Sequence, residues 1–230
     1  MVAIDKKSIV CFGLLAVAFA PSVGAEETGG ITVEGSVAFV TDYRFRGVSL
    51  SDKDGAVQAG LTVTGSSGLY GSVWGSSIES FNGAETETDF VIGYGGKTDS
   101  GLSYDVGALL YAYPGGAGTD YYEFYGSLSK DFEQFSASAG MAYNPSQANI
   151  GGQDNIYIFT DVGYEVVDTP FGLTGHFGYE DGAFGDNKLD WALGVSAAYE
   201  GLEFGVSYVD TNLKASGGKG GVMLSIGAAF

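Results

Sequence analysis

The chain has 230 residues, of which 10 are basic and 28 acidic, and its formal net charge is −18. So acidic a protein is a poor partner for nucleic acid, because binding nucleic acid requires a basic surface. With 15 tyrosines and 15 phenylalanines, the chain is also too rich in aromatic side chains for a disordered protein.

The first 25 residues are typical of a secretion signal. Two lysines give a positive start, an apolar run follows over 9–20, and small residues precede a predicted cleavage site at Ala25. No later stretch approaches the roughly 20 apolar residues that a membrane helix needs. Cys11 is the only cysteine and lies in this segment, so we expect no disulfide after cleavage. We predict a signal peptide over 1–25 and a single domain over 26–230.

From residue 31 onward, apolar and polar residues alternate with a period of two. In the first stretch the apolar parity comprises Ile31, Val33, Val37, Phe39, Tyr43 and Phe45. Such alternation is typical of strands with one apolar and one polar face. The pattern recurs in about twelve stretches, an even number, as in single-chain bacterial membrane barrels. Only the stretch 69–78 is ambiguous, because Tyr70 and Trp74 oppose Leu69 and Val73 in parity.

The predicted connections alternate in length. Short ones cover 65–68, 96–101, 130–134, 167–170 and 200–201, and longer ones cover 51–55, 79–86, 113–120, 144–155, 180–188 and 210–220. Hairpins that are short at one end and long at the other are typical of an up-and-down barrel with long extracellular loops.

The residue types on the polar face indicate whether the apolar face points outward, as in a membrane barrel, or inward, as in a soluble sandwich. A soluble exported sandwich would alternate too, with its apolar face inside. The polar positions here hold Gly, Ser, Thr, Asp, Glu and Gln but few Lys, which suits a crowded, watery interior. We therefore predict an all-β, up-and-down antiparallel transmembrane β-barrel of about 12 strands, since a sheet in hydrocarbon must leave no unpaired edge. Tyrosines and Trp191 near strand ends are expected at the bilayer interfaces.

Several segments carry more than periodicity. The stretches "VTDYRFRGVSLSD" (40–52), "AVQAGL" (56–61), "GLYGSVWGSS" (68–77) and "YDVGALLYAYP" (104–114) together resemble the TorF-type porin family of Gram-negative bacteria. The resemblance covers most of the chain after residue 25, and its most specific parts are Y-x-F-R-G and A-V-Q. It implies an outer-membrane location and a channel role, with membrane lipid and small solutes as partners. Phe230 resembles the C-terminal aromatic residue by which the barrel-assembly machinery recognises outer-membrane barrels.

If the apolar parity faces lipid, the polar parity lines the lumen. The predicted lumen or constriction residues are Asp42, Arg44, Arg46, Gln58, Glu87, Asp89, Asp105 and Glu123. The arginines could create a transverse field against wall carboxylates and select solutes by charge, or they could neutralise buried acids and brace the wall. Because inward carboxylates outnumber the arginines, we expect an open pore to prefer cations. A barrel of this size can form either a narrow channel or a plugged interior.

Other functions have weaker support in the sequence. The single histidine, His176, shares the lumen parity and has no nucleophile motif beside it, so we predict a structural role and no enzyme, with an outer-membrane hydrolase as the weaker alternative. The acidic loops do not have the spacing of a calcium-binding loop, and the sequence has no cluster of His and Cys that could bind zinc. No metal or cofactor is therefore expected. Outer loops rich in Gly, Asn and Asp leave a binding or adhesion role open.

Overall fold

The computed structural model describes residues 26–28, 30–214 and 217–230, so the predicted signal peptide lies outside the described residues. Its strands are β1 (Glu26–Thr28), β2 (Ile31–Val40), β3 (Arg44–Phe45), β4 (Val48–Ser49), β5 (Ala56–Gly65), β6 (Leu69–Phe81), β7 (Ala84–Lys97), β8 (Leu102–Ala112), β9 (Tyr121–Phe132), β10 (Phe135–Asn144), β11 (Asn155–Glu165), β12 (Phe171–Gly182), β13 (Gly185–Tyr199), β14 (Leu202–Thr211) and β15 (Gly221–Ala229). A short 3-10 turn, η1, covers Ala148–Ile150. Among the described residues, no helix is long and apolar enough to cross a membrane.

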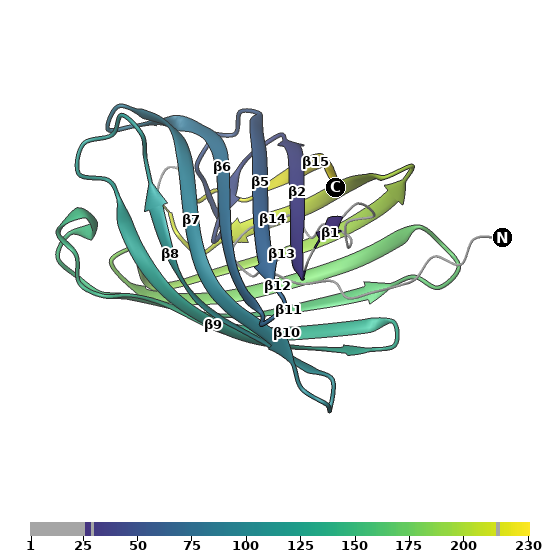
Figure 1. Cartoon of the computed structure of the whole chain (residues 1–230). Helices are drawn as coiled ribbons and strands as arrows, with labels where there is room; N and C mark the ends of the chain where they lie inside the picture. Colours follow the sequence, from purple (N-terminus) through teal and green to yellow (C-terminus); the bar gives the residue numbers. More distant parts are fainter. Residues whose placement is uncertain (1–25, 29, 215–216) are drawn as a thin grey trace.

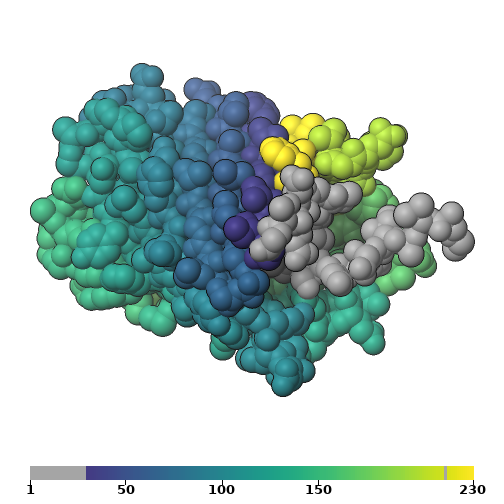
Figure 2. Space-filling model, in the orientation of Figure 1, coloured from purple at the N-terminus to yellow at the C-terminus, as the bar shows by residue number. Residues whose placement is uncertain are grey.

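Strand β2 and the strands from β5 to β15 form one closed antiparallel barrel of 12 strands (Figure 1). The ring closes where β15 pairs with β2, with Ser225 opposite Val40, while β2 pairs on its other side with β5. Figure 2 shows the yellow C-terminal region next to the purple region that contains β2. Phe230 extends this seam, because its N–H and C=O bond the backbone of Gly35 at 2.9 and 2.7 Å. The predicted fold is confirmed.

The apolar side chains point out of the barrel and the polar ones point in. On β5 and β7, for example, Val57 is 60% exposed and Ile92 62%, whereas Gln58 is 4% exposed and Glu87 1%. The apolar face is therefore not buried between two sheets, as a sandwich would require. The ambiguous stretch follows the same rule, since Leu69 is exposed and Tyr70 is buried.

Two predicted loops are wrong. The segments 79–86 and 180–188 continue as strands, and β6 and β7 are joined by only Asn82 and Gly83. Both residues have positive φ, at 49° and 96°, as a two-residue type I′ hairpin turn requires. Similarly, β12 and β13 are joined by Ala183 and Phe184. These hairpins are taller than the sequence predicts, so residues near their tips belong to the barrel wall.

The first predicted strand, over 31–45, is wrong after Val40. Strand β2 ends at Val40, and the chain then turns into the lumen, where β3 and β4 form a small hairpin. Its turn is Arg46 and Gly47, with φ of 47° and 84°, again the type I′ geometry. Tyr43, predicted to face lipid, is 4% exposed inside the barrel, and Phe45 lies beside it in the same hydrophobic cluster. We call residues 41–55 the plug.

Candidate functional site in the barrel lumen

The plug crosses the lumen from one wall to the other. The Tyr43 ring packs against Trp74 of β6, with ring centres 5.5 Å apart, and the Phe45 ring packs edge-on against Tyr111 of β8 at 5.7 Å. On the opposite side, Gly47 lies so close to β13 and β14 that a Cβ there would be 2.8 Å from the Cβ atoms of Asp190 and Thr211. Contacts with walls on both sides mean that the plug spans the barrel at this level.

Arg46, at the tip of the plug, is held by two strands of the wall. Its Nη1 donates to Oε1 of Glu180 on β12 at 2.6 Å, and its Nη2 donates to Oε2 of Glu123 on β9 at 2.7 Å. The guanidinium carbon lies 4.2 Å from the ring centre of Tyr157, a cation–π contact. All of this is dry, since the side chains of Glu123 and Glu180 have no exposed surface. We call Glu123, Glu180 and Tyr157 the clamp.

The clamp is supported from behind by other residues of the wall. The Tyr111 hydroxyl donates to Oε1 of Glu123 at 3.3 Å, and Nδ2 of Asn155 donates to Oε1 of Glu180 at 3.0 Å. The ammonium of Lys188 on β13 forms an ion pair with the other oxygen of Glu180. These partners fix the positions of the carboxylates independently of Arg46.

Arg44 contacts the plug itself and a neighbouring loop, whereas Arg46 contacts the barrel wall. Its Nε donates to Oδ2 of Asp42 at 2.7 Å, and its other nitrogens bond the backbone oxygens of Gly47 and Lys219. The second oxygen of Asp42 accepts a bond from Ser49 on β4 at 2.6 Å. The expectation that both arginines face wall carboxylates is therefore correct for Arg46 only. Because β2 ends before Arg44, this residue closes the plug on itself and on the β14–β15 loop.

Two predicted acids, Glu87 and Asp89, lie side by side on β7 beneath the plug. Glu87 accepts bonds of 2.7 Å from the hydroxyls of Tyr43 and Tyr113, one on each oxygen. Asp89 is 3% exposed, and its Oδ1 has no hydrogen-bond partner among the described residues. A buried carboxylate oxygen without a partner is costly, so this part of the lumen favours a proton or another positive charge at Asp89.

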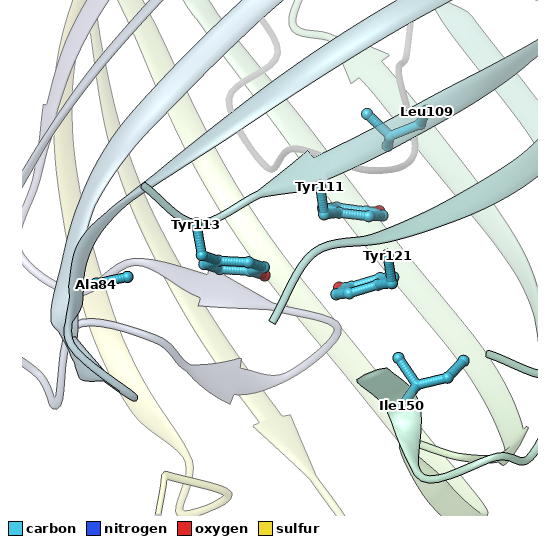
Figure 3. Packing of buried hydrophobic residues seen from close by; sticks show 6 residues of the cluster. All are labelled: Ala84, Leu109, Tyr111, Tyr113, Tyr121 and Ile150. Atoms are coloured by element: carbon cyan, nitrogen blue, oxygen red, sulfur yellow. The ribbon is translucent and has the colours of Figure 1, made fainter. Parts of the chain in front are cut away.

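A group of tyrosines that the sequence pattern does not single out forms the wall beside the plug. Figure 3 shows the rings of Tyr111, Tyr113 and Tyr121 projecting into one space, with the purple hairpin of the plug next to them. Tyr111 and Tyr121 are stacked, with ring centres 4.5 Å apart. The expectation of tyrosines at the bilayer interfaces thus overlooks these three, which are at most 8% exposed. Aromatic rings inside the barrel give the plug an apolar surface to pack on.

The remaining predicted residues lie apart from the clamp. Asp105 on β8 accepts a bond of 3.0 Å from the hydroxyl of Tyr70, which also bonds the hydroxyl of Tyr125. Gln58 on β5 has a weak contact of 3.4 Å with the hydroxyl of Ser76. Asp105 and Gln58 therefore line the lumen without contacting either arginine.

His176 lies on the lumen side, between two carboxylates. Its Nδ1 is 2.6 Å from Asp161 and its Nε2 is 3.0 Å from Asp190, which also accepts a bond from the Tyr157 hydroxyl. The nearby Ser138 hydroxyl donates to Asp161 rather than to the imidazole. A serine nucleophile needs the histidine as its base, so this geometry lacks the central contact of a hydrolase triad.

Three functional residues escaped prediction as members of the constriction: Glu180, Lys188 and Tyr157. The first two were placed in a loop over 180–188, although Glu180 shares the lumen parity of His176. Tyr157 alternates with the outward residues Ile156 and Ile158, so its parity does signal a lumen position. Extending the alternation to the ends of the tall hairpins finds Glu180 and Lys188 as well.

The barrel is similar in fold to several outer-membrane proteins of known structure, porins among them. The KdgM porin superposes with a TM-score of 0.59 at 9% identity, covering 86% of this chain and 98% of that one. The NanC porin gives 0.57 at 13% identity, with coverage of 86% and 98%, and the outer-membrane phospholipase A of Escherichia coli gives 0.55 at 10% identity, with 90% and 93%. At these identities the likeness is one of fold.

The chain belongs to the family Gcw_chp, a bacterial protein family of unknown function, whose model matches residues 24–226. No curated protein matches the sequence. The family is bacterial and the fold is similar to that of outer-membrane porins, and both findings agree with a resemblance to bacterial porins in general. The TorF-type assignment itself stays a prediction.

Proposed function

We propose that the protein is an outer-membrane channel through which small solutes diffuse passively, with a preference for cations. The observation that carries this proposal is the inverted polarity of a closed barrel, with apolar side chains outside and carboxylates within. The porin folds of KdgM and NanC support it. Export by a signal over 1–25 and assembly through Phe230, whose side chain is exposed at the seam, belong to the same proposal.

The preference for cations rests on the charges that line the lumen. The inward acids are Asp42, Glu87, Asp89, Asp105, Glu123, Asp161, Glu180 and Asp190, whereas the inward bases with a permanent charge are Arg44, Arg46 and Lys188. A lumen with an excess of one sign of charge concentrates ions of the opposite sign.

The plug adds a condition to conduction. The plug contacts walls on both sides, and its Arg46 is buried. These contacts support the proposal that the lumen is closed at this level while Arg46 lies in the clamp. The protein therefore conducts when the plug leaves the clamp. A barrel whose plug never leaves would be a structural element of the membrane.

The sign of selectivity is the direct test of the channel. In a planar bilayer with a KCl gradient, the wild type is expected to give a reversal potential of cation-selective sign. Asp105→Asn removes a half-buried lumen carboxylate that contacts neither arginine, and we expect the cation preference to fall about fivefold, since one charge interaction at 4 Å in water is worth about 1 kcal/mol. Asp99→Asn, in the exposed β7–β8 turn, is the matched control and should change nothing. An anion-selective wild type would contradict the proposal.

The lipid-facing surface has its own test. Ile92→Arg places a charge on the exposed outer face of β7 and is expected to destabilise the barrel by about 2–4 kcal/mol if that face meets the middle of a bilayer. Urea unfolding of the protein in lipid vesicles measures the loss, with Ile92→Leu as the control of similar volume. Equal stability of the two variants would mean that this face does not lie in hydrocarbon.

A further inference from the structure

We infer that the clamp is a binding site for small guanidinium compounds and that Arg46 of the plug is its built-in ligand. This inference rests on the proposed function and deepens it, since it names a class of solute that the lumen recognises. Guanidinium compounds and Arg46 then compete for the same place, and the solute favours the state in which the plug is released.

The shape of the clamp fits a guanidinium group better than other cations. Two carboxylates from separate strands each accept from a different terminal nitrogen, at 2.6 and 2.7 Å, while the face of the group lies 4.2 Å from the ring centre of Tyr157. A planar fork meets both carboxylates and the ring at once, whereas an ammonium is a point charge. A tetramethylammonium ion carries no donor for either carboxylate.

The clamp is built by the barrel wall and remains in place without the plug. Glu123 is held by Tyr111, Glu180 by Asn155 and Lys188, and the Tyr157 hydroxyl donates to Asp190 at 3.1 Å. A site whose groups are fixed by neighbours loses little conformational entropy when a ligand binds.

Electrostatics favour the uptake of a cation by the vacated clamp. Once Arg46 has left, the two carboxylates that it covers face the single ammonium of Lys188, with Asp190 close by. Removing one partner of a buried ion pair leaves an uncompensated charge, which is strongly unfavourable. A solute with a guanidinium head replaces both the charge and the hydrogen bonds.

Coupling to the plug follows from this competition. The clamp holds Arg46 only while the plug is inside, and a ligand shifts a conformational equilibrium by its difference in affinity for the two states. A guanidinium solute binds only the released state, because Arg46 occupies the clamp in the other. Solute binding and plug release are therefore linked.

Chemical rescue tests the inference. In Arg46→Ala, methylguanidinium at concentrations far below denaturing ones should raise the unfolding temperature of the detergent-solubilised barrel in a saturable way, because a ligand of the native state stabilises it by mass action. The wild type, whose clamp is occupied, and Arg46→Ala/Glu123→Gln, whose clamp is broken, should not respond. Tetramethylammonium at equal concentration should have no effect on any of them. No rise in Arg46→Ala, or an equal rise in all three proteins, would overturn the inference.

A second measurement does not depend on folding of the Arg46 variant. Cys11, the only cysteine, lies in the predicted signal segment, so Val48→Cys gives a single reporter on strand β4 of the plug. Methylguanidinium should increase the rate of maleimide labelling at this position several-fold, and Glu123→Gln in the same background should abolish the increase. An unchanged rate in the Val48→Cys protein would contradict the inference.

Failure of the inference and failure of the proposed function are distinguishable. Rescue and labelling are measured without ion flow. A protein that responds to methylguanidinium but never conducts would therefore support the binding site and contradict the channel. A protein that conducts but shows neither rescue nor faster labelling would support the channel and contradict the guanidinium site.

Discussion

Arg46→Ala is expected to raise the open probability of the channel, and with it the mean conductance, by about tenfold or more. Removing one partner of a buried ion pair costs about 3–5 kcal/mol, and each 1.4 kcal/mol changes an equilibrium constant tenfold. In the wild type this energy holds the plug across the lumen through Glu123 and Glu180. Without the guanidinium, the two carboxylates no longer attract the plug, and the lumen opens at this level. Conductance in planar bilayers and the swelling rate of proteoliposomes in small sugars measure the effect.

The control for this variant is an exposed ion pair. Lys97 and Asp131 are 3.8 Å apart with side chains 49% and 39% exposed, and such surface pairs contribute about 0–1 kcal/mol. Lys97→Ala also removes one positive charge, but it should leave the conductance unchanged. If Arg46→Ala conducted no better than Lys97→Ala, the clamp would not be what keeps the lumen closed.

Gly47→Val is expected to open the lumen by a steric route. A Cβ at this position would lie 2.8 Å from Asp190 and Thr211, and the φ of 84° is one that β-branched residues avoid. The left-handed backbone costs about 1–2 kcal/mol and overpacking about 1–3 kcal/mol. Both effects destabilise the state in which the plug is seated in the lumen, and neither acts on the barrel wall. The barrel should therefore keep its stability while its conductance rises. Electrophoresis without heating reports the folded barrel, and bilayer recording reports the conductance.

A second glycine separates the two causes. Gly151 follows η1 with a similar φ of 81°, but a Cβ there meets nothing within 4 Å. Gly151→Val therefore introduces the same backbone strain without the clash, at a position outside the plug. Increased conductance in Gly151→Val as well as Gly47→Val would show that loop strain, and not the close approach of the plug to β13 and β14, controls the opening.

Most of the barrel could be predicted from the sequence because alternation of period two is a local signal. Each strand carries its own facing, as Val57 and Gln58 show, and a barrel needs no other pattern. The two tall hairpins were missed where the turn signal is short. Asn82-Gly83 is a common type I′ pair, but the polar residues on both sides of it predict a longer loop.

The plug could not be predicted in the same way. The alternation continues from β2 through Phe45 and Arg46, so the sequence looks like one long strand where the structure has a bend and a second hairpin. Its turn is Arg-Gly, and arginine seldom adopts a positive φ. What holds Arg46 there is the clamp, whose residues lie 77 and 134 positions away in the chain. Contacts over such separations leave no local trace in a sequence.

The same distant contacts link the plug to the order of assembly. Glu123 and Glu180 reach Arg46 only if β9 and β12 have the correct register, because a slip of one residue turns a side chain from one face of a sheet to the other. A barrel joined out of register at either strand would present a carboxylate to the lipid and could not seat its plug. Seating of Arg46 therefore requires the correct register at both strands, and a barrel that fails to seat it would leave residues 41–55 open to proteolysis.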